Sequence, residues 1–271
     1  WIGTRKLPYT YTDVPSPLTD NHMIASVYID GEYIFLDPTN SDLPYPLPSS
    51  FTQGKEALIG LSSDSFLIQQ VPILPSTDNI NYDSATFELN EMDITGSGTR
   101  SYTGYYADNI NYNLHNKDQV QLKNLFKSHV RKGSNKCQSD GYRLNRNPNN
   151  TSIDYQFEVP GYAYKTEDKI FINMNLEKVL YSSKIEADRV HPVEYKYAYK
   201  IIRDFTFAIP EGYTLEYIPE NSTSQYEYFG YSVAYEALDG KLHYHLEIEL
   251  NNLRISNDDF TNWNEMIKSL N

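Results

Sequence analysis

The sequence has 271 residues, and its 36 Asp and Glu residues outnumber its 23 Lys and Arg residues, for a formal net charge of −13. An acidic surface repels phosphate backbones, so we do not expect nucleic-acid binding. No stretch approaches about 18 apolar residues, so no transmembrane segment is expected. The 25 tyrosines favour a mainly β fold, because aromatic side chains fit half-buried pleated surfaces. The single cysteine, Cys137, excludes an internal disulfide bond.

The first 78 residues contain the clearest hairpin signal of the sequence. Residues 23–30 alternate into a strand, Asp30-Gly31 is typical of a two-residue turn, and residues 32–37 form the return strand. The prolines of residues 38–54 predict a loop, and residues 66–74 predict another strand. We take residues 1–78 as the first structural region.

We expect the second region, residues 79–188, to be β-rich with one helix. The Gly96-Ser97-Gly98 triplet predicts a turn between strands at 85–94 and 99–106. Alternating apolar residues predict two further strands at 153–159 and 170–176.

The helix of this region is predicted at residues 117–130, where apolar residues recur at helical spacing. Asn116 is placed to cap its beginning, and Gly133 to end it. Residues 133–151 are polar, which predicts a loop.

The third region, residues 189–271, predicts an antiparallel β domain. Side chains alternate over residues 195–209 and 231–250, with a second Asp-Gly turn at Asp239-Gly240. A short helix closes the chain, because Phe260, Trp263, Ile267 and Leu270 recur at spacings of three and four.

His22 and Asp37 are the candidate catalytic residues. If Asp30 and Gly31 form the hairpin loop, Asp37 faces Ile24, two residues after His22. Side chains alternate faces along a strand, so His22 and Asp37 project from the same face as diagonal neighbours. A carboxylate beside a histidine fixes the ring tautomer and supports the imidazolium form. This pair supplies the base and the orienting residue of a nucleophilic triad.

The segment NHMIASVYIDGEYIFLDPTN, residues 21–40, resembles the His and Asp motifs of the transglutaminase-like superfamily. In that family the His opens one strand and the Asp ends the next, often within an Asp-Pro-Thr triplet. The resemblance implies a parent protein that is a cysteine peptidase, amidase or acyltransferase, acting on a peptide or protein without a cofactor. It also implies an α+β remnant of a papain-like core, followed by antiparallel β domains with a C-terminal helix.

The C-terminal third resembles one subgroup of this superfamily. The runs FTFAIPEGYTLEYIPEN, residues 205–221, and FTNWNEMIKSL, residues 260–270, are similar to the last domain of large envelope proteins of Bacteroidetes. In these proteins a β domain of unknown function follows the transglutaminase-like core. The resemblance implies location in the bacterial periplasm or cell envelope.

The nucleophilic Cys of the family is absent from the chain. It would precede His22, and none of the 21 residues before His22 is Cys. Cys137 follows in the wrong order and lies in a polar segment, without a helix N-terminus that would lower its pKa. We therefore expect the chain to be inactive as it stands. Truncation of a longer enzyme and native loss of the Cys in a pseudoenzyme both remain open.

Two other readings compete with the enzyme remnant. A Tyr-rich β domain presents an aromatic surface to a glycan or protein partner if tyrosines such as Tyr226, Tyr228 and Tyr235 are exposed. His243 and His245 share one strand face with Glu247 and Glu249, a pattern that also fits a metal site. Alternation of a solvated strand face explains that pattern without a metal, so we assign none.

Overall fold

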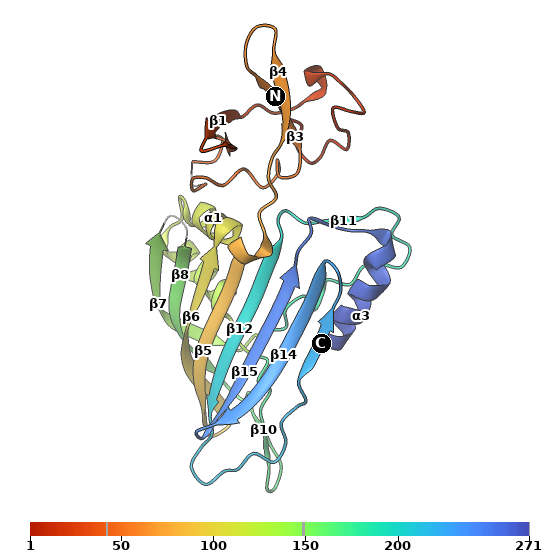
Figure 1. Cartoon of the computed structure of the whole chain (residues 1–271). Coiled ribbons are helices and arrows are strands. Elements are labelled where there is room, and N and C mark those ends of the chain that lie inside the picture. The colour runs from red at the N-terminus through yellow and green to blue at the C-terminus, as the bar shows by residue number, and fades with distance from the viewer. Residues whose placement is uncertain (42, 148–149, 271) are drawn as a thin grey trace.

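The main body of the molecule is one eight-stranded sheet (Figure 1). The computed structural model describes residues 1–41, 43–147 and 150–270. In spatial order the strands are β13 (Ser222–Gln225), β14 (Phe229–Leu238), β15 (Lys241–Leu250), β12 (Tyr199–Ala208), β5 (Ile80–Asn90), β6 (Asp93–Thr103), β8 (Asn150–Val159) and β7 (Gln138–Asn147). Among the strands of the described residues, only β12 and β5 pair in parallel. Strands from the predicted regions 79–188 and 189–271 thus share one sheet, and the mainly β fold is confirmed.

One face of this sheet carries the core. Alternate residues of β12 and β15 are buried, as period-two patterning requires. Helices α1 (Gly104–Leu114), α2 (Gln119–Val130) and α3 (Phe260–Leu270) contribute residues to the same hydrophobic cluster. Trp263 of α3 packs edge-on against Phe229 of β14, which fixes the C-terminal helix on the sheet.

Short elements complete the body. Two two-stranded pairs, β9 (Tyr164–Lys165) with β10 (Ile170–Phe171) and β11 (Val193–Glu194) with β16 (Arg254–Ile255), lie in the connections. Single turns of 3₁₀ helix occur at Pro17–Thr19, Ser76–Asp78 and Asn257–Asp259. No helix in the described ranges is both long and apolar enough to cross a membrane.

The N-terminal segment lies beyond one end of the large sheet (Figure 1) and has a small core of its own. Its strands are β1 (Ala25–Ile29), β2 (Glu32–Leu36), β3 (Glu56–Gly60) and β4 (Phe66–Gln70). The hairpin register is confirmed, with Ala25 opposite Leu36 and Ile29 opposite Glu32. Ile2 bridges to His22 on one side and to Ala57 on the other, so it connects the two hairpins.

A row of charged residues crosses the otherwise apolar face of the large sheet. Arg203 of β12, Asp83 of β5 and Arg100 of β6 are neighbours in register. Lys132 donates to Asp83 at 2.6 Å, and both side chains are fully buried. Glu177 covers the row and pairs with Arg100 at 2.7 Å and Arg203 at 2.6 Å. Three cations thus share two carboxylates in the interior.

Several local predictions in the second region are wrong. Gly96 and Gly98 lie inside β6 and not in a turn, because the rings of Phe157 and Tyr155 occupy the space of their missing Cβ atoms. The chain turns instead after β5, where Glu91 has a φ of 55°.

Helix α1 replaces the end of the strand predicted at 99–106. Asn79 accepts a hydrogen bond from the backbone N–H of Tyr105 at 2.9 Å, so a residue distant in sequence caps this helix. Gly104 has a φ of 53°, which favours glycine where the strand turns into the helix.

Helix α2 begins two residues later than predicted, at Gln119, and ends at Val130 as predicted. Asp118, and not Asn116, forms its capping box with Gln121. Residues 138–147 form the edge strand β7 where a loop was predicted, because a strand paired on one side tolerates polar residues. Of the strand predicted at 170–176, only Ile170 and Phe171 pair.

We predict that Glu177→Gln lowers the free energy of unfolding by about 3 kcal/mol, because it leaves three buried cations with one carboxylate. Denaturant unfolding measures the change. Glu216→Gln is the matched control, since Glu216 pairs with Lys169 at 2.7 Å but is 67% exposed. The control is expected to change stability by less than about 0.5 kcal/mol. Equal effects of the two variants would contradict this assignment.

We predict two steps of acid destabilisation. Burial, and then the charge of Arg100, lowers the pKa of His129 from 6.5 to about 4. The folded state therefore binds fewer protons than the unfolded state, and stability falls as the pH drops from 6.5 to about 4. Burial opposes ionisation of Glu177, but Arg203, Arg100 and Lys132 hold its pKa well below the ordinary value of 4.5. The contribution of ionised Glu177 to the stability of the fold is therefore lost in a second step, as the pH falls below 4.5.

Unfolding curves measured across this pH range separate the two residues. His129→Gln is expected to flatten the first step and to leave the second. A first step of unchanged size in this variant would assign the proton uptake to another group.

Candidate functional site

His22 and Asp37 contact each other as the hairpin register predicts. Nε2 of His22 lies 2.8 Å from Oδ2 of Asp37. The His22 backbone exchanges two hydrogen bonds of 3.1 Å with Ile2, which holds the strand that carries the imidazole. The Asp37 side chain is 1% exposed and that of His22 is 17% exposed. The carboxylate is therefore shielded from water, while the imidazole is still reachable.

Four hydrogen-bond donors surround the Asp37 carboxylate. Thr39 donates to Oδ1 through its backbone N–H at 3.1 Å and its hydroxyl at 2.7 Å. Ser49 donates to Oδ2 at 2.7 Å, beside His22. Burial opposes ionisation of Asp37, but the bonds from Ser49, Thr39 and His22 outweigh it and lower the pKa of this carboxyl. Asp37 is therefore a stable anion beside the imidazole.

This geometry explains the Asp37-Pro38-Thr39 triplet physically. A carboxylate that accepts bonds from the residue two positions ahead closes a local turn. Thr39 supplies both a backbone and a side-chain donor to this turn. The triplet thus locks the carboxylate in place as β2 ends.

Ser49 is the site residue that the sequence does not reveal. It comes from the proline-containing loop of residues 38–54 and is buried. The adjacent carbonyl of Pro48 accepts a 2.5 Å hydrogen bond from the hydroxyl of Tyr105 in α1. Asn40 donates to Asp108 of the same helix at 2.8 Å. The main body thus holds the loop that holds Asp37.

The imidazole of His22 has one nitrogen free for chemistry. Nε2 faces Asp37, and Nδ1 has no hydrogen-bond partner among the residues that the structure describes. Phe51 packs edge-on against the ring, with centroids 5.3 Å apart. A ring that donates through Nε2 to a carboxylate presents Nδ1 as a base. The pair can therefore take up a proton and stabilise the resulting imidazolium.

Cys137 does not belong to this site. It lies between α2 and β7, where its Sγ accepts a hydrogen bond from the backbone N–H of Lys132 at 3.3 Å. Burial raises the pKa of the thiol. A nucleophilic cysteine needs the opposite shift, so Cys137 has a structural environment.

The histidines of β15 have other partners. Nδ1 of His245 lies 2.6 Å from Oδ1 of Asp204, and Nδ1 of His243 lies 3.1 Å from the hydroxyl of Thr206. Within the described ranges, no group of three or more His, Cys, Asp or Glu residues is arranged to hold a metal ion.

The tyrosine row proposed as a binding platform is only partly exposed. Tyr226, Tyr228 and Tyr235 are half-buried against the main core. Tyr197 stacks on Tyr105, with ring centroids 5.2 Å apart. These tyrosines therefore contribute to the core, whereas Tyr213 and Tyr217 are 49% and 78% exposed.

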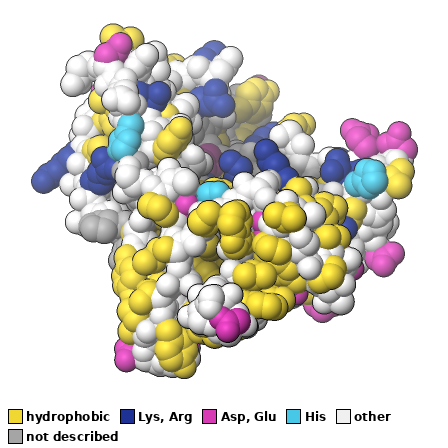
Figure 2. Space-filling view, turned by 90° about the horizontal axis from the view of Figure 1, so that it is seen from above, with side chains coloured by type: hydrophobic (Ala, Val, Ile, Leu, Met, Phe, Trp, Pro, Cys, Tyr) yellow, Lys and Arg dark blue, Asp and Glu magenta, His cyan; other side chains and the backbone are white. Residues whose placement is uncertain are grey.

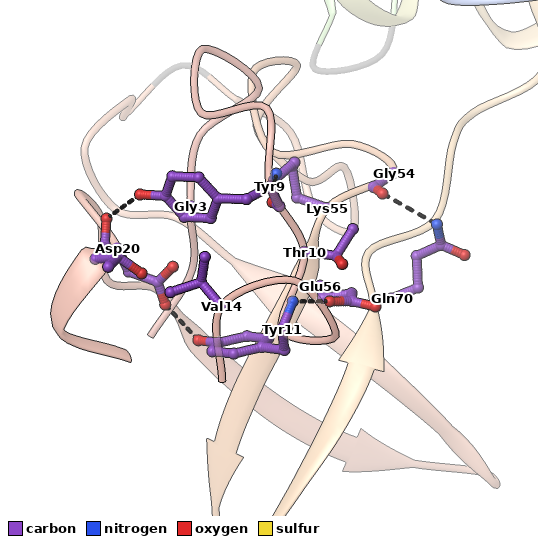
Figure 3. A pocket seen from close by; sticks show the side chains of 11 residues that line it. Gly3, Tyr9, Thr10, Tyr11, Val14, Asp20, Gly54, Lys55, Glu56 and Gln70 are labelled. Atoms are coloured by element: carbon purple, nitrogen blue, oxygen red, sulfur yellow. Dashed lines mark hydrogen bonds between the residues drawn. The ribbon is translucent and has the colours of Figure 1, made fainter. Parts of the chain in front are cut away.

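A small cavity of about 80 Å³ lies in the segment that precedes His22, and polar groups that line it bond to one another (Figure 3). The hydroxyl of Tyr11 donates to Asp20, and the backbone N–H of Tyr11 donates to Glu56 at 2.6 Å. Lys55 donates to the carbonyls of Leu7 and Tyr9 at 2.8 Å each. His22 and Asp37 do not line this cavity, so its bonds serve to fix the segment that leads into His22.

Comparison with known families identifies one part of the chain. Residues 167–271 match a family described as a domain of unknown function with a solved structure, DUF3858. No curated protein matches the chain. The matched range contains β12 to β15 and α3. The C-terminal part of the chain, residues 167–271, is therefore a DUF3858 domain.

Proposed function

We propose that the chain is the C-terminal part of a transglutaminase-like cysteine peptidase, amidase or acyltransferase. In this proposal His22 is the general base and acid, and Asp37 is the residue that orients it. The observation that carries the proposal is the 2.8 Å contact between Nε2 of His22 and a buried carboxylate with three further donors. The nucleophilic Cys belongs to a segment of the parent protein that is not in this chain.

The proposed chemistry uses the free nitrogen of His22. The thiol gives its proton to Nδ1 of His22, and the sulfur attacks the carbonyl carbon of a peptide or isopeptide bond. The C–N bond then breaks, and His22 returns the proton to the leaving amine. Water or a second amine releases the acyl group from sulfur, which distinguishes a hydrolase from a transferase.

Asp37 contributes to each step without exchanging a proton. Its lowered pKa keeps it anionic, and the hydrogen bonds of Thr39 and Ser49 prevent it from rotating away from the ring. An anion at 2.8 Å stabilises the imidazolium that forms when Nδ1 is protonated. Loss of the negative charge of Asp37 is therefore expected to reduce activity more than loss of the hydroxyl of Thr39 or of Ser49.

The proposal carries over two expectations of the resemblance. The substrate is a peptide or protein amide, and the parent protein works in the bacterial periplasm or cell envelope. In this proposal the DUF3858 domain supports the N-terminal segment, since Arg5 donates to the carbonyls of Tyr195 and Lys196 at 2.7 and 3.1 Å.

The decisive experiment restores the upstream segment of the parent and measures release of an amine from a glutamine- or peptide-amide substrate. We predict that His22→Gln lowers kcat/KM by about 10³-fold or more, because base and acid catalysis are both lost. Asp37→Asn is predicted to lower it by about 10²-fold or more, because the imidazolium loses its counter-charge.

His245→Gln is the matched control, since His245 also pairs with an aspartate, at 2.6 Å, but on the large sheet. This variant is expected to retain full activity. Equal activity of the parent and its His22→Gln variant would remove the assigned base. A parent that lacks both the Cys and the activity would be a pseudoenzyme, which would overturn the catalytic assignment.

A further inference from the structure

A slot one strand wide lies between the hairpin β1–β2 and the hairpin β3–β4. Trp1 and Ile2 occupy one end of it, because Ile2 bridges antiparallel to His22 and to Ala57. The rest of the slot is an open cavity of about 310 Å³. It is lined by Trp1 and by residues of the two hairpins: Met23, Ile24, Ser26, Phe35, Ala57, Leu58, Ile59 and Gly60.

The backbone groups that face the slot follow from strand alternation. Ile2 exchanges two hydrogen bonds with His22, so the backbone groups of Ile24 and Ser26 point to the same side as those of His22. Trp1 exchanges hydrogen bonds with Leu58 at 2.9 and 3.0 Å, so the groups of Gly60 point towards the slot.

Beyond the contacts that Ile2 makes with His22 and Trp1 makes with Leu58, both edges of the slot are unpaired among the described residues. In the part of the chain that the structure describes, β1 pairs only with β2, and β3 pairs only with β4. Two facing strand edges with free N–H and C=O groups form a template for one additional strand. A single strand inserted there would satisfy both edges and join the two hairpins into one sheet.

We infer that this slot takes one extended polypeptide strand that enters on the amino side of Trp1 and runs antiparallel to β1 and β3. The inference rests on the proposed function, in which the chain is the C-terminal part of a longer protein. Continuity with Trp1 and Ile2 selects this occupant, because these residues already set the direction and register of the strand.

The surroundings of the slot define the side chains of the incoming strand. The position directly before Trp1 shares the face of Ile2 and meets Ile24 and Ile59, which pack on the small core. An apolar β-branched residue fits there. Trp1 and Met23, on the other face, are 51% and 59% exposed, so the next position points outward. Figure 2 shows hydrophobic side chains gathered on one side of this end of the molecule.

The inserted strand would position His22. The ladder that holds the His22 backbone ends at Ile2, so each further pair along β1 extends the support of the strand that carries the imidazole. The segment that completes the sheet thus comes from the upstream part of the parent that the proposed function requires.

Hydrogen exchange tests this inference without any catalytic readout. We compare the chain with a version that has Thr-Val-Thr-Val added before Trp1. Valine then occupies the inward positions opposite Ile24 and Ser26. The amides of Ile24, Ser26 and Gly60 are expected to exchange roughly tenfold more slowly, because each enters a ladder. Amides of β12 and β15 serve as the internal reference and are expected to stay unchanged.

The control extension is Thr-Val-Pro-Pro, of equal length and with the same displacement of the terminal ammonium group. Proline lacks the N–H that would donate to the carbonyls of Ile24 and Gly60, so the ladder is weakened and much less slowing is expected. Equal exchange in the two extended versions would overturn the inference. Slowing of the same amides in the unextended chain as its concentration rises would also overturn it, because a second copy would then fill the slot. Inactivity of the parent would not affect either outcome.

Discussion

The buried charge cluster around Asp83 is the interaction on which the main body depends. The parallel pair of β12 with β5 joins the two antiparallel parts of the large sheet, and Arg203 and Asp83 face each other across this junction. Buried charges are costly unless they are paired and hydrogen-bonded. Asp83 meets this requirement through Lys132 at 2.6 Å and the hydroxyl of Tyr155 at 2.5 Å. The cluster therefore stabilises one arrangement of the strands, the end of α2 and the Glu177 segment.

A continuous series of contacts connects this body to the candidate site. The β5–β6 hairpin leads into α1, whose Tyr105 and Asp108 hold the loop of residues 38–54. That loop provides Ser49, and Ser49 donates to Asp37. On the other side, Arg5 of the N-terminal segment donates to the carbonyl of Tyr195 at 2.7 Å. The His22–Asp37 pair is thus placed by local turn chemistry and supported by the DUF3858-containing body.

The sequence predicts those parts of this arrangement that depend on near neighbours. The Asp30-Gly31 turn sets the register of β1 and β2, and with it the contact of His22 with Asp37. The Asp239-Gly240 turn does the same for β14 and β15. Predictions fail where distant residues decide. The Gly96-Ser97-Gly98 triplet predicts a turn, but in the structure the two glycines make room in a strand for the rings of Phe157 and Tyr155. Ser49 and the cap that Asn79 provides for α1 leave no local pattern, because their partners are far away in sequence.

The central claim is that Asp37 fixes His22 with Nε2–H towards the carboxylate and Nδ1 free to accept a proton. Long-range ¹H–¹⁵N NMR of the chain, at a pH where the ring is neutral, measures which nitrogen carries the hydrogen. We predict that His22 is held as the Nε2–H tautomer, and that Asp37→Asn abolishes this preference. A neutral His22 that carries its proton on Nδ1, or that shows the same tautomer mixture in both proteins, would contradict the account.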